Sequence, residues 1–183
     1  MPEYEKVAAA FKGEQDVVIS QIDADKYRDV GSRFGVKGFP TIKFFAKDAK
    51  DAPIDVEAAR STQAFVDYVN ERTGTRRNAD GTLASDAGRH EELDTVAAKF
   101  VAADAEERSK LIGEAEAISR AISGRYSKQA QYYVKAMNAI NIKGAEYVAK
   151  ERARLQRMIA SGSVKPQAVD DFTARNNILA AFE

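Results

Sequence analysis

The chain has 183 residues, of which 44% are hydrophobic and 31% are charged, and these proportions argue against disorder over its whole length. The 28 basic residues are balanced by 28 acidic residues, so the net charge favours neither nucleic acid nor an anionic membrane as a partner. At this length we expect two small domains.

The residue types exclude most familiar catalytic sites. Cysteine is absent, which rules out a thiolate nucleophile, a thiolate metal ligand and a disulfide. The single histidine, His90, rules out a histidine-cluster metal site, and we expect it to be exposed at the start of a polar helix. No apolar run approaches the roughly 18–20 residues of a membrane span, and the N-terminal residues lack the layout of a signal peptide. We therefore expect no catalytic residue, no metal, no cofactor and no membrane insertion.

Residues 1–75 change hydrophobic period several times, which is typical of an α/β region. Ser61 and Gly74 have the residue types of a helix N-cap and a helix stop. The apolar residues near position 19 do not alternate, which favours a strand covered on both faces. In chain order the pattern predicts a helix over residues 3–11, a strand over 16–23, a helix over 27–34, a strand over 41–45, a weak strand near 54–56 and a helix over 62–72.

The second half of the chain has helical periodicity throughout. Residues 76–88 contain several turn-forming residues and little apolar mass, so we expect a linker there. Residues 89–183 then predict about five amphipathic helices in a compact bundle. Asp104, followed three residues later by Glu107, predicts one helix start.

Charge is distributed unevenly within this helical half. Residues 91–116 hold mainly acidic side chains, whereas residues 125–157 hold mainly basic ones. We interpret both stretches as solvated helix faces that attract one another across the bundle. Nucleic-acid binding would need aromatic residues interleaved with the basic ones on a single face, and we do not expect it.

Two stretches carry a resemblance to a known family. Residues 34–45 read FGVKGFPTIKFF and strongly resemble the cis-proline segment of the thioredoxin-like domains of protein disulfide isomerases. Residues 132–155 and the ending RNNILAAF at 175–182 resemble the small helical domain of ERp29-type isomerases. The resemblance implies a fold of α/β plus all-α class, in which a partial thioredoxin-like fold is followed by a five-helix bundle of the ERp29 C-terminal type.

The resemblance also implies that part of the thioredoxin-like domain is missing. In the family, a dithiol motif lies just ahead of the stretch that corresponds to residues 1–5, so its first strands, first helix and cysteines have no counterpart here. The strand at 17–22 would then lose its neighbours on both sides. We expect it to pair antiparallel with residues 41–45, to recruit a strand from another chain, or to leave residues 1–75 partly disordered.

Three site residues follow from the resemblance rather than from the pattern alone. Phe39 and Pro40 would form a cis peptide bond that leaves adjacent backbone open for an extended peptide. Arg60 resembles an arginine that tunes the family's redox site, although without a cysteine we expect it to be a surface charge.

We interpret the chain as a redox-inactive member of the family that binds unfolded or partly folded polypeptides in the lumen of the endoplasmic reticulum. Self-association into a homo-oligomer is left open. Two alternatives remain: a helical adaptor that docks a partner protein through the bundle, and a truncated form of an active disulfide isomerase. The sequence shows no retention tetrapeptide, so the expected location depends on the resemblance alone.

Overall fold

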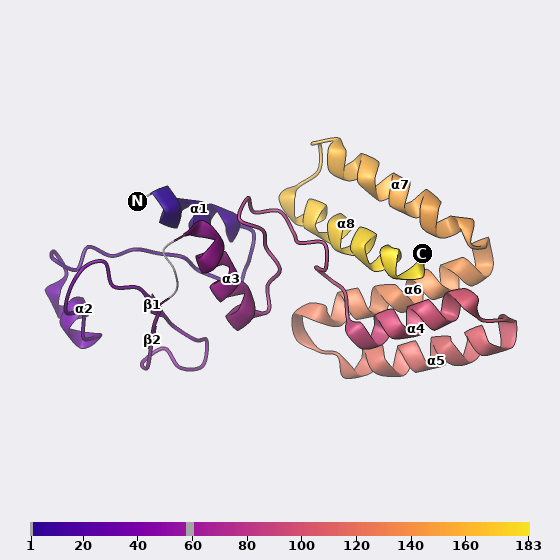
Figure 1. Cartoon of the computed structure of the whole chain (residues 1–183), viewed down its shortest axis with the longest axis horizontal. Coiled ribbons are helices and arrows are strands. Elements are labelled where there is room, and N and C mark those ends of the chain that lie inside the picture. The colour runs from indigo at the N-terminus through magenta and orange to yellow at the C-terminus, as the bar shows by residue number, and fades with distance from the viewer. Residues whose placement is uncertain (1, 58–60) are drawn as a thin grey trace. The chain divides into compact units, whose positions relative to one another are not determined.

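The computed structural model describes residues 2–57 and 61–183, which form two compact units, Met1–Gly81 and Thr82–Glu183 (Figure 1). We call them unit 1 and unit 2 and treat each by itself. Unit 1 contains short helices and strands, and unit 2 is helical. None of the described helices is both long and apolar enough to span a membrane.

In residues 2–57 and 61–81, unit 1 is built from three helices and a small antiparallel sheet. Its elements are α1 (Pro2–Ala10), α2 (Arg28–Arg33), β1 (Lys43–Phe44), β2 (Ile54–Asp55) and α3 (Thr62–Thr73). Strand β1 pairs with β2 so that Phe44 lies opposite Ile54. The expected strands over 41–45 and 54–56 are therefore present in shortened form, and they pair with each other.

The local signals for α3 are confirmed. Ser61 is its N-cap, and its hydroxyl accepts a hydrogen bond of 3.2 Å from the backbone N–H of Ala64. The helix ends at Gly74, which adopts the left-handed conformation with φ of 68°. Buried side chains of α3, such as Phe65 and Val66, pack against Val7 and Phe11 to form the core of unit 1.

The predicted strand over residues 16–23 is wrong. The segment is extended, but the structure assigns it no ladder, and it does not pair with residues 41–45. Val17 and Ile19 pack against the core, while Val18 and Ile22 are exposed. The segment is thus covered on one face only. It forms no strand because a β-branched run becomes a strand only where a partner backbone lies beside it.

Unit 2 is the expected five-helix bundle. Its α-helices are α4 (Glu91–Ala102), α5 (Ala105–Ala121), α6 (Ser127–Lys143), α7 (Glu146–Ala160) and α8 (Pro166–Leu179), with short 3₁₀ helices at η1 (Gly124–Tyr126) and η2 (Ala180–Phe182). Each α-helix contributes to one core, for example Phe100, Leu111, Tyr133, Leu155 and Ile178. The N-cap predicted at Asp104 is present, since its carboxylate accepts a 2.9 Å hydrogen bond from the N–H of Glu107.

Residues 76–88, the predicted linker, contain the boundary between the units but are held in place on either side of it. Within unit 1, the side chain of Arg77 is buried. Within unit 2, Ala87 is buried, and the amide of Asn177 donates hydrogen bonds to the carbonyls of Ala84 at 3.0 Å and Ala87 at 3.1 Å. Little of this segment therefore behaves as a free connection.

Candidate functional site

The cis-proline segment lies between α2 and β1 in unit 1. The Phe39–Pro40 peptide bond is cis, as the resemblance implies. The hydroxyl of Thr41 donates a hydrogen bond of 2.6 Å to the carbonyl of Gly38, which closes the turn around this bond. Both Phe39 and Pro40 are exposed, and 64% of Phe39 is accessible to solvent. The segment therefore presents an aromatic ring and backbone to the solvent.

Other large hydrophobic side chains of unit 1 are also exposed. They lie before α2, after α2, just after β1 and in β2: Val18, Ile22, Tyr27, Phe45 and Ile54, together with Phe39. In unit 2 the corresponding residues are Val101 and Ile142. Single exposed apolar residues are normal on a protein surface, but six of them fall within residues 18–54, where they offer apolar contacts to a partner. We call these six residues of unit 1 the apolar surface.

Backbone groups of the same region lack strand partners. The sheet described in unit 1 has two strands, so β1 and β2 each have one edge without a neighbouring strand. Residues 17–22 add a second stretch of backbone that belongs to no ladder, in which the carbonyl of Ser20 accepts a hydrogen bond of 2.5 Å from the hydroxyl of Tyr4. Unpaired edges of this kind accept an added strand from another polypeptide. Apolar side chains and strand edges together can hold an extended apolar peptide.

The remaining predicted site residue, Arg60, lies outside the described residues. Among the described residues, no group of histidine, cysteine or carboxylate side chains could hold a metal ion. His90 differs from the expectation of an exposed side chain, because it is half-buried and its Nδ1 atom is buried without a hydrogen-bond partner in the described part of the chain. Its backbone N–H donates to the hydroxyl of Tyr133 at 3.2 Å, so its observed role is at the start of α4.

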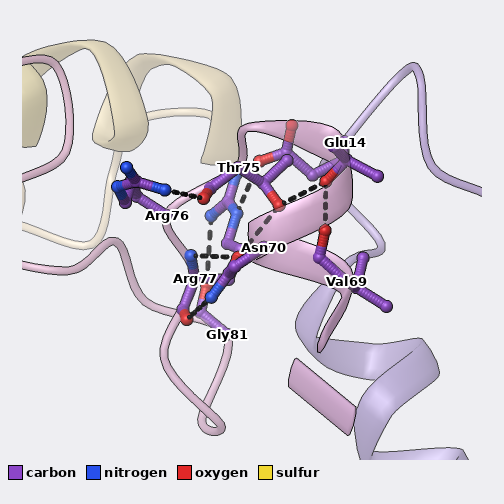
Figure 2. Close-up of polar contacts among 8 residues, drawn as sticks. Glu14, Val69, Asn70, Thr75, Arg76, Arg77 and Gly81 are labelled. Atoms are coloured by element: carbon purple, nitrogen blue, oxygen red, sulfur yellow. Dashed lines mark hydrogen bonds and ion pairs between the residues drawn. The ribbon is translucent and has the colours of Figure 1, made fainter. Parts of the chain in front are cut away.

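Sequence reasoning missed a buried polar cluster in unit 1 (Figure 2). The Nε atom of Arg77 donates to a carboxylate oxygen of Glu14 at 2.8 Å, and its guanidinium also donates to the carbonyl of Gly81 at 3.1 Å. Asn70, on α3, accepts from the N–H of Arg77 at 3.0 Å and from the hydroxyl of Thr75 at 2.9 Å. These contacts fix the segment after α3 against the end of α1, so the cluster supports the unit rather than a ligand.

A second polar contact joins the two helices that form the core of unit 1. The carboxylate of Glu3 accepts hydrogen bonds from the backbone N–H of Thr62 at 3.0 Å and from the hydroxyl of the same residue. These bonds, with one from Lys6, lower the pKa of Glu3 to about 2. The ionised carboxylate of Glu3 thus holds the start of α1 at the start of α3.

Comparison with known proteins gives two family matches. Residues 88–182 match the family described as "Endoplasmic reticulum protein ERp29, C-terminal domain", and residues 1–71 match the thioredoxin family. Among similar proteins, the probable protein disulfide-isomerase A6 of Medicago sativa is 41% identical over 99% of this chain and 49% of its own length.

Relatives from other organisms show a similar identity to the chain and also match it over about half of their own length. Protein disulfide-isomerase 1 of Dictyostelium discoideum is 38% identical over 100% of this chain and 50% of its own length. Protein disulfide-isomerase tigA of Aspergillus niger is 41% identical over 99% of this chain and 48% of its own length. The chain therefore spans about half the length of these relatives. With its thioredoxin-like region followed by an ERp29 C-terminal domain, it belongs to the protein disulfide-isomerase family.

Proposed function

We propose that the chain binds unfolded or partly folded polypeptides, without catalysing thiol–disulfide exchange, in the lumen of the endoplasmic reticulum. The observation that carries this proposal is the apolar surface of unit 1. Unfolded chains differ from folded ones in exposing apolar side chains and unpaired backbone, and this surface offers partners for both. The membership in a family of folding enzymes and the description of its C-terminal domain support the role and the location.

The redox part of the proposal depends on composition. Thiol–disulfide exchange begins with attack by a thiolate, and the chain contains no cysteine. The purified chain should therefore give no turnover above a protein-free control in an insulin-reduction assay. Turnover that scales with chain concentration would contradict this part and leave polypeptide binding to be judged by itself.

The binding part can be tested with a protein whose disulfides have been reduced and alkylated, so that it stays unfolded. Fluorescence anisotropy should show that the chain binds this labelled protein and not its folded form. The double variant I22S/F39S removes two apolar side chains and should weaken binding by about tenfold. The matched control V101S changes an exposed valine of unit 2 and should leave the affinity unchanged. Equal binding of the folded and unfolded forms would overturn the proposal.

A further inference from the structure

A pocket of about 340 Å³ lies on the surface of unit 2, at the end of α6 and along α7. Its size is at the lower end of the range of ligand sites in proteins. One lining residue, Lys143, comes from the end of α6, and the others come from α7: Glu146, Tyr147, Lys150, Glu151, Arg154 and Arg157. The α7 residues recur at intervals of three and four positions, so they form one stripe along the helix.

The stripe is long compared with a small ligand. Positions 146 and 157 are eleven residues apart in α7, which corresponds to roughly 16 Å along a helix axis. Ile142, next to Lys143 in the chain, is 83% exposed. An extended polypeptide could follow the whole stripe, whereas a single small anion would contact only part of it.

The charges that line the pocket do not balance. Four of the lining side chains are basic and two are acidic. Glu146 forms an ion pair with Lys150 at 2.9 Å. Glu151 accepts two hydrogen bonds of 2.8 Å from Arg154. Both carboxylates are therefore engaged within α7. Their partners Lys150 and Arg154 are paired on their own helix, whereas the sequence predicted that the basic stretch is attracted to the acidic stretch of residues 91–116.

Neither of the remaining two cations forms an ion pair with a carboxylate among the described residues, although the charge of Lys143 contributes to the lowered pKa of Glu151. The ammonium of Lys143 lies over the ring of Tyr147, 5.2 Å from its centre. The Nε atom of Arg157 donates to the backbone carbonyl of Ala153 at 3.3 Å, within its own helix. Both side chains are exposed and have further N–H donors. The pocket thus has an excess of positive charge with donors that an anionic ligand could use.

Two further groups strengthen this preference. Hydrogen bonds from Arg154 lower the pKa of Glu151, so its carboxylate stays ionised and occupied by that arginine. Burial, followed by the charge of Glu151, raises the pKa of Tyr147, so its hydroxyl adds no negative charge to the pocket. A ligand with carboxylates therefore meets an excess of cations here, and a basic ligand would be repelled.

We infer that this pocket binds an acidic segment of a polypeptide, in which several Asp or Glu side chains follow one another along the α7 stripe. The inference rests on the proposed polypeptide-binding function and deepens it, because it names a class of sequence and a second surface, in unit 2, that selects it. Charge complementarity would make this binding fast and sensitive to salt.

The test uses the full chain and a short fluorescein-labelled peptide rich in Asp and Glu, with an Asn- and Gln-rich peptide of equal length as the neutral probe. We expect the acidic peptide to bind and the neutral one to bind at least about tenfold more weakly. The variant K143Q/R157Q should weaken binding of the acidic peptide by about tenfold, because it removes both uncommitted cations. The variant K143R/R157K keeps the charges and should retain the affinity.

The matched control is K128Q/K135Q, which removes two exposed lysines of α6 that do not line the pocket. It should leave the affinity for the acidic peptide within about twofold of the unaltered chain. Equal binding of the acidic and neutral peptides, or equal weakening by K128Q/K135Q and K143Q/R157Q, would overturn the inference. If the unfolded protein still binds while the acidic peptide does not, only this inference fails. If the unfolded protein does not bind, the proposed function fails first.

Discussion

Arg77 and Glu14 form a buried ion pair between parts of unit 1 that are far apart in the sequence. The atoms Nε and Oε1 are 2.8 Å apart, and the two side chains are 6% and 14% exposed. The pair joins the segment after α3 to the segment after α1, and Figure 2 shows both residues. A buried cation needs its partner, since an uncompensated charge in the interior costs several kcal/mol.

We therefore expect E14Q to lower the free energy of unfolding of unit 1 by about 3 kcal/mol, because it replaces a carboxylate that pairs with the buried guanidinium of Arg77 by a neutral amide. Hydrogen exchange of the backbone amides of α1 and α3, measured at increasing urea concentrations, would give the change in the free energy of unfolding. The control is D51N, which removes the exposed pair of Arg33 and Asp51 and should change stability by less than about 0.5 kcal/mol. Similar effects of the two substitutions would contradict the importance of burial.

The contact between Glu3 and Thr62 predicts a dependence of stability on pH. The folded state lowers the pKa of Glu3 from 4.5 to about 2, so its contribution is complete above pH 4.5 and is lost as the pH falls towards 2. E3Q should flatten the fall in the melting temperature of unit 1 over this interval. The control E5Q changes an exposed carboxylate of the same helix and should leave the profile as it was. An unaltered profile in E3Q would contradict this assignment.

The hydroxyls of Tyr133 and Tyr68 are bonded differently, so the two tyrosines should respond differently to loss of the hydroxyl. The hydroxyl of Tyr133 donates to Asp94 and accepts from the N–H of His90, so Y133F should destabilise unit 2 by about 1–3 kcal/mol. The hydroxyl of Tyr68 in unit 1 is buried without a hydrogen-bond partner among the described residues. Y68F should therefore leave stability unchanged or raise it slightly. Thermal unfolding of both variants would show whether the signs differ as expected.

The predictability of this structure from its sequence differed between elements. The helix at 62–73 followed from Ser61 and Gly74, because capping depends on residues a few positions apart. The strand expected at 16–23 failed because a ladder depends on which backbone lies beside it, which no local pattern specifies. Arg77 and Glu14 are 63 positions apart, so nothing in either neighbourhood indicated that they would meet.

The α6–α7 pocket shows the same limit on a smaller scale. The three- and four-residue spacing of charges on α7 could be read from the sequence and places them on one face. Which carboxylates pair with which cations depends on the side-chain conformations, and these left Lys143 and Arg157 without an ion pair to a carboxylate among the described residues. The excess positive charge of the pocket thus became evident only in the structure.

Unit 2 should fold without unit 1, because its helices share a single core and make mostly local contacts. Where the fragment begins should matter. A fragment starting at Arg89 lacks the carbonyls of Ala84 and Ala87 that accept from Asn177, so its free energy of unfolding should be about 1–3 kcal/mol lower than that of one starting at Thr82. Equal stability of the two fragments would show that the segment before α4 adds nothing to the bundle.

The segment before α4 lies against α8 in unit 2. Gly88 has φ of 84°, and a Cβ atom there would lie 2.9 Å from the Cβ of Ala174. The segment that enters unit 2 thus packs closely against α8, the last long helix. The ring of Phe182 packs edge-on against that of Phe100 on α4, with the ring centres 6.3 Å apart. The first residues of the unit thus lie on its last long helix, and its last residues lie on its first helix. Neither end of unit 2 can loosen without releasing a helix that belongs to the opposite end of the sequence.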